Sequence, residues 1–287
     1  MTAPVLVTGA SGLLGGAIVA RAALRTTVVG VSRRDGPWLR ADVGSPHELA
    51  SVLDEVQPGV VVHAAGCTRG TPAELEDGNV GLLETVLDEA ARRELPVVAL
   101  GSAAEYGDPG SARPLGEDDT PCPVSPYGRS KLDASRGVVA RRRRGEPVTV
   151  ARLFTLVGPG IPSDQVVGEL SEKVQALPER GGVVSVGNAD VVRDVVTVDF
   201  AADAVLALAR ARPPDPIINV CSGAGIRLGD FVAALARHRG VDATVESRGE
   251  PAIMTVVGDP SRLRSATGLD GRLDLPELAA AALGQTA

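Results

Sequence analysis

The chain has 287 residues, a net charge of −7 and an aromatic content of only 2%. Its length is sufficient for one α/β domain with a smaller second region, whereas the negative charge and the scarcity of aromatic side chains argue against a nucleic-acid partner. No apolar run approaches the roughly 20 residues that span a bilayer. The three cysteines lack metal-ligand spacing, so we expect a cytoplasmic protein with neither a membrane nor a metal partner.

Strand and helix signals alternate along the first half of the chain. Apolar runs predict strands near Val5 and at Thr27–Val31, Val60–Ala64, Val97–Leu100 and Val148–Leu153. Helical periodicity predicts helices at Leu13–Leu24, Pro46–Val56, Val80–Arg93 and Pro126–Arg143. This alternation indicates βαβ units and a Rossmann-type, doubly wound parallel sheet. The strands lack alternating polarity, as expected when helices cover both faces.

The regular alternation weakens after Arg152, and the glycines and prolines of residues 158–162 interrupt the chain. We therefore predict a dinucleotide-binding domain over residues 1–153 and a smaller, mainly substrate-binding region over residues 154–287. Some segments of the second region are expected to return to the first. Ligands of such sheets bind beyond the carboxyl ends of the strands, so the second region is placed to close over that crevice.

The first strand is followed by the sequence T-G-A-S-G-L-L-G at residues 8–15, which is typical of a strand, a tight turn and a helix. Gly9 lets the chain leave the strand, Gly12 lets the backbone approach a phosphate, and Gly15 lets the helix pack closely. The helix N-terminus favours a bound pyrophosphate. The predicted phosphate-binding turn consists of Gly9, Ser11, Gly12, Leu13, Leu14 and Gly15.

The end of the second predicted strand, with Ser32, Arg33 and Arg34, indicates which dinucleotide binds. An acidic residue there would bind the ribose 2′-hydroxyl of NAD, whereas arginine suits the 2′-phosphate of NADP. We therefore predict NADP(H) in preference to NAD(H), with these three residues as contacts. The alternative is a pair of solvated loop arginines. Trp38 either covers the adenine or lies on the surface.

Tyr127 and Lys131 are four residues apart, so they share one face of a predicted helix. A nearby ammonium group favours the phenolate, which would lower the pKa of Tyr127 and suit it to acid–base catalysis. Ser102 follows a predicted strand and is placed to hold a substrate oxygen opposite Tyr127. Each residue also has a structural interpretation, as a tyrosine packed on a lysine stem or a serine in a turn.

Together these segments resemble the extended short-chain dehydrogenase/reductases, in the branch of NAD(P)-dependent nucleotide-sugar epimerases, dehydratases and ketoreductases. The resemblance covers nearly the whole chain. It includes further family motifs in the family's order, at residues 63–66 (H-A-A-G), 79–81 (N-V-G), 152–160 (R-L-F-T-L-V-G-P-G) and 193–199 (R-D-V-V-T-V-D).

The resemblance implies that Ser102, Tyr127 and Lys131 are catalytic. It implies further cofactor contacts at Asp42, Val43, Ala64, Ala65, Gly66 and Phe154, besides Tyr127 and Lys131. It also implies a homodimer and substrate contacts at Ser102, Ala103, Ala104, Thr155 and Arg193. Thr155 replaces the asparagine that commonly touches the substrate diphosphate in the family.

The reaction type follows from the residues after Ser102. The related dehydratases place an acidic pair or a glutamate there to eliminate water, whereas this chain has Ala103 and Ala104. Glu105 comes one place later and is expected to point elsewhere. We therefore predict an NADPH-dependent ketoreductase for a 4-keto-6-deoxy nucleotide sugar. The alternatives are a nucleotide-sugar epimerase, a ketoreductase for a polyketide-type ketone, and a non-catalytic dinucleotide-binding sensor.

Overall fold

The computed structural model describes residues 3–108, 110, 113–249 and 255–285. Its largest layer is a seven-stranded sheet in the order β10-β6-β5-β4-β1-β2-β3, with all neighbours parallel. The strands are β1 (Val5–Thr8), β2 (Val28–Ser32), β3 (Leu39–Arg40), β4 (Val60–His63), β5 (Val97–Ser102), β6 (Val148–Leu153) and β10 (Ile217–Val220). The predicted doubly wound parallel sheet is confirmed.

The strand order reverses beside β1, because β2 and β3 lie on one side of it and β4, β5 and β6 on the other. Thr8 at the end of β1 pairs with Val31 on one side and His63 on the other, so the three strands end level. This is the switch point at which such sheets bind ligands. The glycine turn follows β1 directly and therefore lies there.

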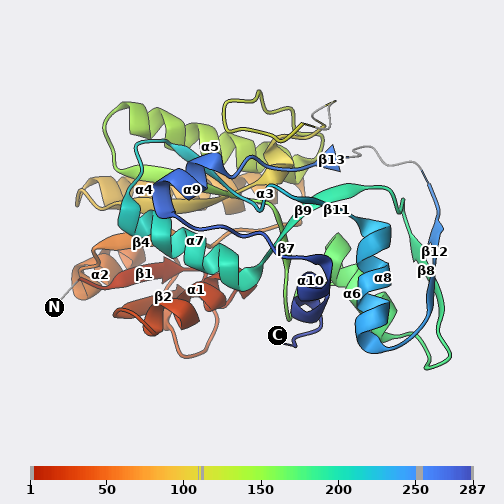
Figure 1. Ribbon diagram of the computed structural model, residues 1–287. Coiled ribbons are helices and arrows are strands. Elements are labelled where there is room, and N and C mark those ends of the chain that lie inside the picture. The colour runs from red at the N-terminus through yellow and green to blue at the C-terminus, as the bar shows by residue number, and fades with distance from the viewer. Residues whose placement is uncertain (1–2, 109, 111–112, 250–254, 286–287) are drawn as a thin grey trace.

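Helices cover both faces of the sheet (Figure 1). One face packs against α1 (Leu13–Ala23), α7 (Val198–Ala211) and α9 (Ser261–Thr267), and the other against α2 (Pro46–Val56), α4 (Leu82–Ala91) and α5 (Pro126–Arg143). Along β1, Leu6 joins one core and Val7 the other. Because both faces are buried, the strands are continuously apolar.

The helix predicted at Val80–Arg93 begins differently from the expectation. A short helix, α3 (Pro72–Glu76), is followed by a π-helical turn at Asp77–Gly81, and only then does α4 start. The wider turn places Asn79 inside, where its side chain bonds the backbone of Cys67 and the Ser130 hydroxyl at 2.9–3.2 Å. The turn thus fixes the chain that follows β4.

The remaining elements form the part drawn on the right of Figure 1. Its helices are α6 (Val166–Gln175), α8 (Leu228–Arg239) and α10 (Leu275–Ala282), which share a separate apolar core. Its strands are β7 (Thr155–Val157), β8 (Gly182–Val186), β9 (Val192–Thr197), β11 (Gly225–Arg227), β12 (Ala243–Ser247) and β13 (Thr255–Val256). Between them, α7 and β10 rejoin the main sheet, where β10 pairs with β6. Among the described residues, no helix is both long and apolar enough to cross a membrane.

Candidate active site

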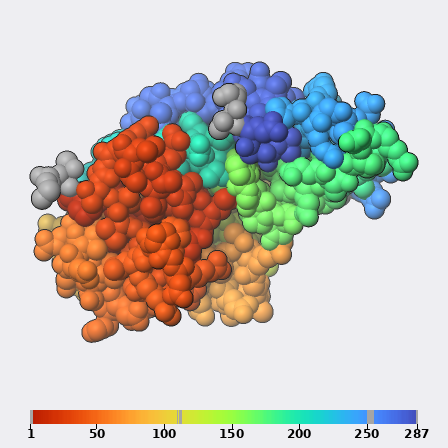
Figure 2. Space-filling model, turned by 90° about the horizontal axis from the view of Figure 1, so that it is seen from below, coloured from red at the N-terminus to blue at the C-terminus, as the bar shows by residue number. Residues whose placement is uncertain are grey.

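A cavity of about 600 Å³ lies beyond the carboxyl ends of the central strands, where the two parts of the molecule meet. Figure 2 shows this meeting as a hollow between the N-terminal elements in red and orange and the green segment around residue 165. A smaller hollow of about 230 Å³ adjoins it, and Ala64, Ala65 and Gly66 line both. The two form one continuous groove of the size expected for a cofactor with its substrate.

The glycine turn forms one end of the groove. Gly9 has φ +70°, and a Cβ there would lie 2.6 Å from the Ala65 nitrogen. Gly12 lines the smaller hollow and begins α1 without a side-chain cap, which leaves first-turn N–H groups open to an anion. Gly15 lines neither hollow. A Cβ at Gly15 would lie 2.2 Å from the Gly9 carbonyl oxygen, so its absence lets α1 pack on its own turn.

Two arginines at the end of β2 line the smaller hollow beside Asp42 and Val43. The Ser32 hydroxyl donates to the Ser11 hydroxyl at 2.7 Å and so ties β2 to the glycine turn, while Arg33 and Arg34 are exposed. Asp35 pairs with Arg40 at 3.2 Å and does not line the hollow. These residues fit a ribose that carries a 2′-phosphate.

Two further observations concern the same hollow. The Asp42 carboxylate accepts a hydrogen bond from the Gly44 N–H at 2.9 Å. Trp38 does not line the hollow; its ring lies against Gly30 and Gly36. Neither expected position of Trp38 is found, because the side chain does not line the hollow and is half-buried beside β2.

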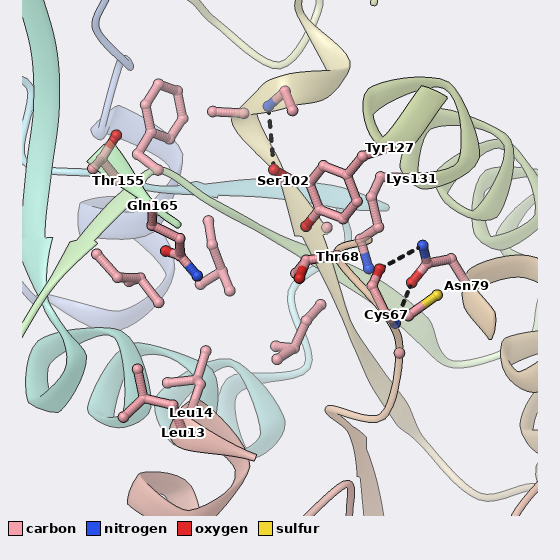
Figure 3. A pocket seen from close by; sticks show the side chains of 18 of the residues that line it. Leu13, Leu14, Cys67, Thr68, Asn79, Ser102, Tyr127, Lys131, Thr155 and Gln165 are labelled. Carbon is pink, nitrogen blue, oxygen red and sulfur yellow. Dashed lines mark hydrogen bonds between the residues drawn. The ribbon is translucent and has the colours of Figure 1, made fainter. Parts of the chain in front are cut away.

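Ser102, Tyr127 and Lys131 share one wall of the larger cavity (Figure 3). Ser102 is the last residue of β5, and the other two lie in the first turns of α5. Helix α5 starts there because the Ser125 side chain accepts from the Gly128 N–H at 3.0 Å. In Figure 3 the Tyr127 hydroxyl points into the cavity that Ser102 also faces, and the Lys131 ammonium lies near the tyrosine ring.

The protonation of Tyr127 differs from the expectation. Burial raises the pKa of its phenol, hydrogen bonding with Ser102 opposes this, and the negative charge of Glu105 adds to it. Burial also lowers the pKa of Lys131, which the Glu105 charge opposes. Desolvation therefore outweighs the expected effect of the ammonium. The phenol is held in its protonated form, which is the form that can donate a proton to a ketone.

The substrate end of the cavity is formed by the predicted residues Ala103, Ala104, Thr155 and Arg193. Arg193 lies on β9, where its guanidinium donates to the Val192 carbonyl at 2.8 Å and burial lowers its pKa. Phe154, Leu13 and Leu14 also line this cavity. Apart from Gly15, every residue predicted to bind cofactor or substrate thus lines the groove.

The cavity also has lining residues that the sequence did not indicate. Thr68 and Arg69 follow β4, whereas Asp164 and Gln165 precede α6, and Figure 3 shows Gln165 facing the cavity from the side opposite Tyr127. Arg69 and Asp164 form an ion pair of 2.5 Å between these two segments. No sequence motif indicated these four residues. The motif at residues 79–81 did contain Asn79, whose side chain bonds the backbone of Cys67 next to Thr68 and Arg69. Within the described part of the chain, no group of three or more His, Cys, Asp or Glu side chains is arranged to hold a metal.

A glycine turn at the switch point of a parallel sheet, facing the same groove as Ser, Tyr and Lys, defines an NAD(P)-dependent enzyme of the short-chain dehydrogenase/reductase type. The chain belongs to the NAD dependent epimerase/dehydratase family, whose model matches residues 5–221.

Two curated relatives and one solved structure are similar over most of the chain. The dTDP-6-deoxy-L-talose 4-dehydrogenase (NAD(P)(+)) of Kitasatospora kifunensis is 32% identical, over 91% of this chain and 86% of its own. The GDP-6-deoxy-D-mannose reductase of Pseudomonas aeruginosa is 27% identical, over 93% of this chain and 86% of its own. The structure of RMD from Pseudomonas aeruginosa complexed with NADPH superposes with a TM-score of 0.86 and 27% identity, covering 99% of this chain and 97% of that one.

Proposed function

We propose that this protein is an NADPH-dependent ketoreductase that acts on a 4-keto-6-deoxy nucleotide sugar. The observation that carries the proposal is the convergence of Ser102, Tyr127 and Lys131 on one cavity wall next to the glycine-turn groove. The names of the relatives, a 6-deoxy-talose 4-dehydrogenase and a 6-deoxy-mannose reductase, support a 6-deoxy sugar nucleotide as the substrate.

Bound NADPH supplies the hydride that reaches the carbonyl carbon. Ser102 holds the ketone oxygen by a hydrogen bond, and the protonated phenol of Tyr127 gives its proton to that oxygen. The Lys131 ammonium stabilises the phenolate that remains and binds the nicotinamide ribose. Donors already in place where charge develops are often the largest catalytic contribution, and the acid contributes roughly 10²–10⁴-fold.

The side chains that line the cavity after Ser102 argue against dehydration. Ala103 and Ala104 line it where a dehydratase would place its acids, and the described lining residues include a single carboxylate, Asp164, which pairs with Arg69. The protonated state favoured for Tyr127 suits the reductive direction. An epimerase is the second candidate, because the family includes epimerases and keeps the same three catalytic residues. A polyketide-type ketone remains an alternative substrate, since Thr155 replaces the family's diphosphate-binding asparagine.

We propose NADPH over NADH because the hollow where the ribose would lie is lined at the β2 end by Ser32, Arg33 and Arg34. The described residues at that strand end place no acidic side chain in the hollow. The NADPH complex of the similar structure supports this choice, whereas the name of the Kitasatospora relative includes both dinucleotides.

We further propose that the protein is cytoplasmic and forms a homodimer through α4 and α5. A molar mass from light scattering near that of a monomer would contradict the homodimer.

The experiment is reduction of dTDP- and GDP-linked 4-keto-6-deoxyhexoses, followed at the nicotinamide absorbance band with NADPH and with NADH. Tyr127→Phe should lower turnover by about 10²–10⁴-fold while the NADPH dissociation constant stays unchanged. The only other tyrosine gives a matched control. Tyr106→Phe removes a buried hydroxyl that bonds Asn219 at 2.8 Å but does not line the cavity, so turnover should persist. Similar turnover in Tyr127→Phe and the wild type would refute the assignment, and a lower Michaelis constant for NADH would refute the cofactor preference.

A further inference from the structure

Ser102 is part of a hydrogen-bonded box that the proposed reaction does not explain. It caps a 3-10 turn at Ala103–Glu105, and its hydroxyl accepts from the Ala104 N–H at 3.2 Å. In return, the Glu105 carboxylate accepts from the Ser102 N–H at 2.8 Å. Reciprocal boxes of this kind commonly start helices, and the Glu105 of this box is 0% exposed.

The second oxygen of Glu105 is held from the neighbouring strand. Arg152 of β6 donates to it from Nε at 3.0 Å and from Nη2 at 2.7 Å, and Arg152 is also 0% exposed. The guanidinium carbon of Arg152 lies 4.5 Å from the centre of the Tyr106 ring. The carboxylate is therefore fixed at both oxygens, one on Ser102 and one on Arg152.

The backbone leaves room for this carboxylate. Gly101 pairs with Arg152 across the sheet, and a Cβ at Gly101 would lie 2.8 Å from the Glu105 Oε1 atom. Any side chain at residue 101 would push the carboxylate away from the Ser102 N–H. The glycine, the glutamate and the arginine thus form one arrangement that ends at Ser102.

Stability alone does not account for the pair. Burying two ions costs several kcal/mol in desolvation, and replacing such a pair by apolar side chains is often neutral or stabilising. The pair has two effects near the cavity. The Glu105 carboxylate holds the Ser102 N–H, and its charge opposes the fall in the pKa of buried Lys131. Both Ser102 and Lys131 line the cavity.

We propose that Glu105, held by Arg152, is a positioning residue that fixes the backbone and hydroxyl direction of Ser102 for hydrogen bonding to the ketone. The inference rests on the proposed function. Since the Ala104 N–H occupies one lone pair of the Ser102 oxygen, the hydroxyl proton is left to donate outward. A residue displaced by about 1 Å from its productive geometry can lose 10²-fold in rate.

Two variants separate position from charge. Glu105→Asp keeps the negative charge beside Arg152 but is one methylene too short to reach both partners, so kcat should fall about 10²-fold with little change in NADPH affinity. The double variant Glu105→Gln with Arg152→Gln removes both charges but keeps an amide oxygen for the Ser102 N–H, so it should lose less of kcat than Glu105→Asp. Wild-type kcat in Glu105→Asp, or equal losses in both variants, would overturn the proposal.

Amide hydrogen exchange gives a readout that needs no substrate. In Glu105→Asp, a peptide covering residues 102–106 should exchange faster than in the wild type, and in the double glutamine variant it should not. A fall in kcat without faster exchange would show that Glu105 acts by charge alone, which also overturns the proposal. If the wild type reduces no ketone, the proposed function fails, and the exchange data still decide whether Glu105 holds Ser102.

A matched control comes from another tightly packed arginine. Arg141 of α5 pairs with Glu84 at 2.6 Å and Asp88 at 2.5 Å, and none of the three lines the cavity. Arg141→Gln should lower stability without changing kcat or the exchange of residues 102–106. An equal loss of kcat in this control would mean that general destabilisation explains the Glu105 variants.

Discussion

His63 shows how burial sets the chemistry of a single residue next to the site. Its Nδ1 lies 2.9 Å from the Thr8 hydroxyl, and the ring is almost fully buried at the end of β4. Burial and then the positive charge of Lys131 lower its pKa from 6.5 to about 3. The imidazole is therefore neutral in the folded protein at any pH at which the enzyme is expected to work.

This depressed pKa predicts acid sensitivity. Below about pH 6.5 the unfolded chain binds a proton that folded His63 does not, so the free energy of unfolding should fall as pH decreases, by up to ~1.4 kcal/mol per pH unit. Urea unfolding at a series of pH values measures the slope. His63→Gln should flatten it, whereas His47→Gln, at an exposed histidine of α2, should leave it unchanged. Equal slopes in the wild type and His63→Gln would contradict the assignment.

At the scale of an element, the β1–α1 turn is a tightly constrained connection. Gly15→Ala would place a Cβ 2.2 Å from the Gly9 carbonyl oxygen, so the turn must shift away from its helix. We expect a stability loss of about 1–3 kcal/mol, typical of overpacking, and clearly weaker NADPH binding, since the shifted turn no longer presents its N–H groups. Calorimetric titration and thermal unfolding measure both effects.

The control is a second helical glycine, at which an added Cβ would contact no other atom. A Cβ at Gly81, which precedes α4, would meet nothing within 4 Å. Gly81→Ala should therefore raise stability by up to ~1 kcal/mol and leave NADPH binding unchanged. Unimpaired NADPH binding by Gly15→Ala would show that close packing of α1 on its turn is not required.

Local patterns predicted five of the seven strands of the main sheet and the helices between them, because each βα unit carries its own apolar faces and caps, but they did not predict β3, β10, α7 or α9. They also placed Tyr127 and Lys131 on one face, because four residues make about one helical turn. They missed the Glu105–Arg152 pair, which joins residues 47 apart, because nothing local links β5 to β6. The raised pKa of Tyr127 was likewise missed, since desolvation depends on what packs around the phenol.

At the scale of the whole molecule, the chain passes repeatedly between its two parts. It leaves the main sheet after β6, returns with α7 and β10, and returns again with α9. These crossings join the two parts through the core of the main sheet. On the cavity itself, the Arg69–Asp164 pair joins the segment after β4 to the segment before α6. Both partners belong to loops, so this link can change without unfolding either core.

The Arg69–Asp164 pair predicts how charge at the cavity controls substrate affinity. We expect the diphosphate of a nucleotide sugar to compete with Asp164 for the Arg69 guanidinium, so Asp164→Asn should lower the KM for the keto sugar and Arg69→Gln should raise it. Each change should be severalfold, as expected for the ~1 kcal/mol of an exposed charge interaction. Steady-state kinetics at low and high salt measure it, and high salt should reduce both effects.

The Arg113–Asp119 pair is the matched control for this test. Its arginine and aspartate are 63% and 23% exposed, against 67% and 27% for Arg69 and Asp164, and both pairs measure 2.5 Å. Arg113 and Asp119 do not line the cavity, so Arg113→Gln should leave KM unchanged. If Asp164→Asn raises KM instead, Asp164 serves the substrate directly and Arg69 only holds it in place. If KM is unchanged in both Asp164→Asn and Arg69→Gln, the diphosphate binds away from this end of the cavity, and Arg193 is left as the arginine placed to receive it.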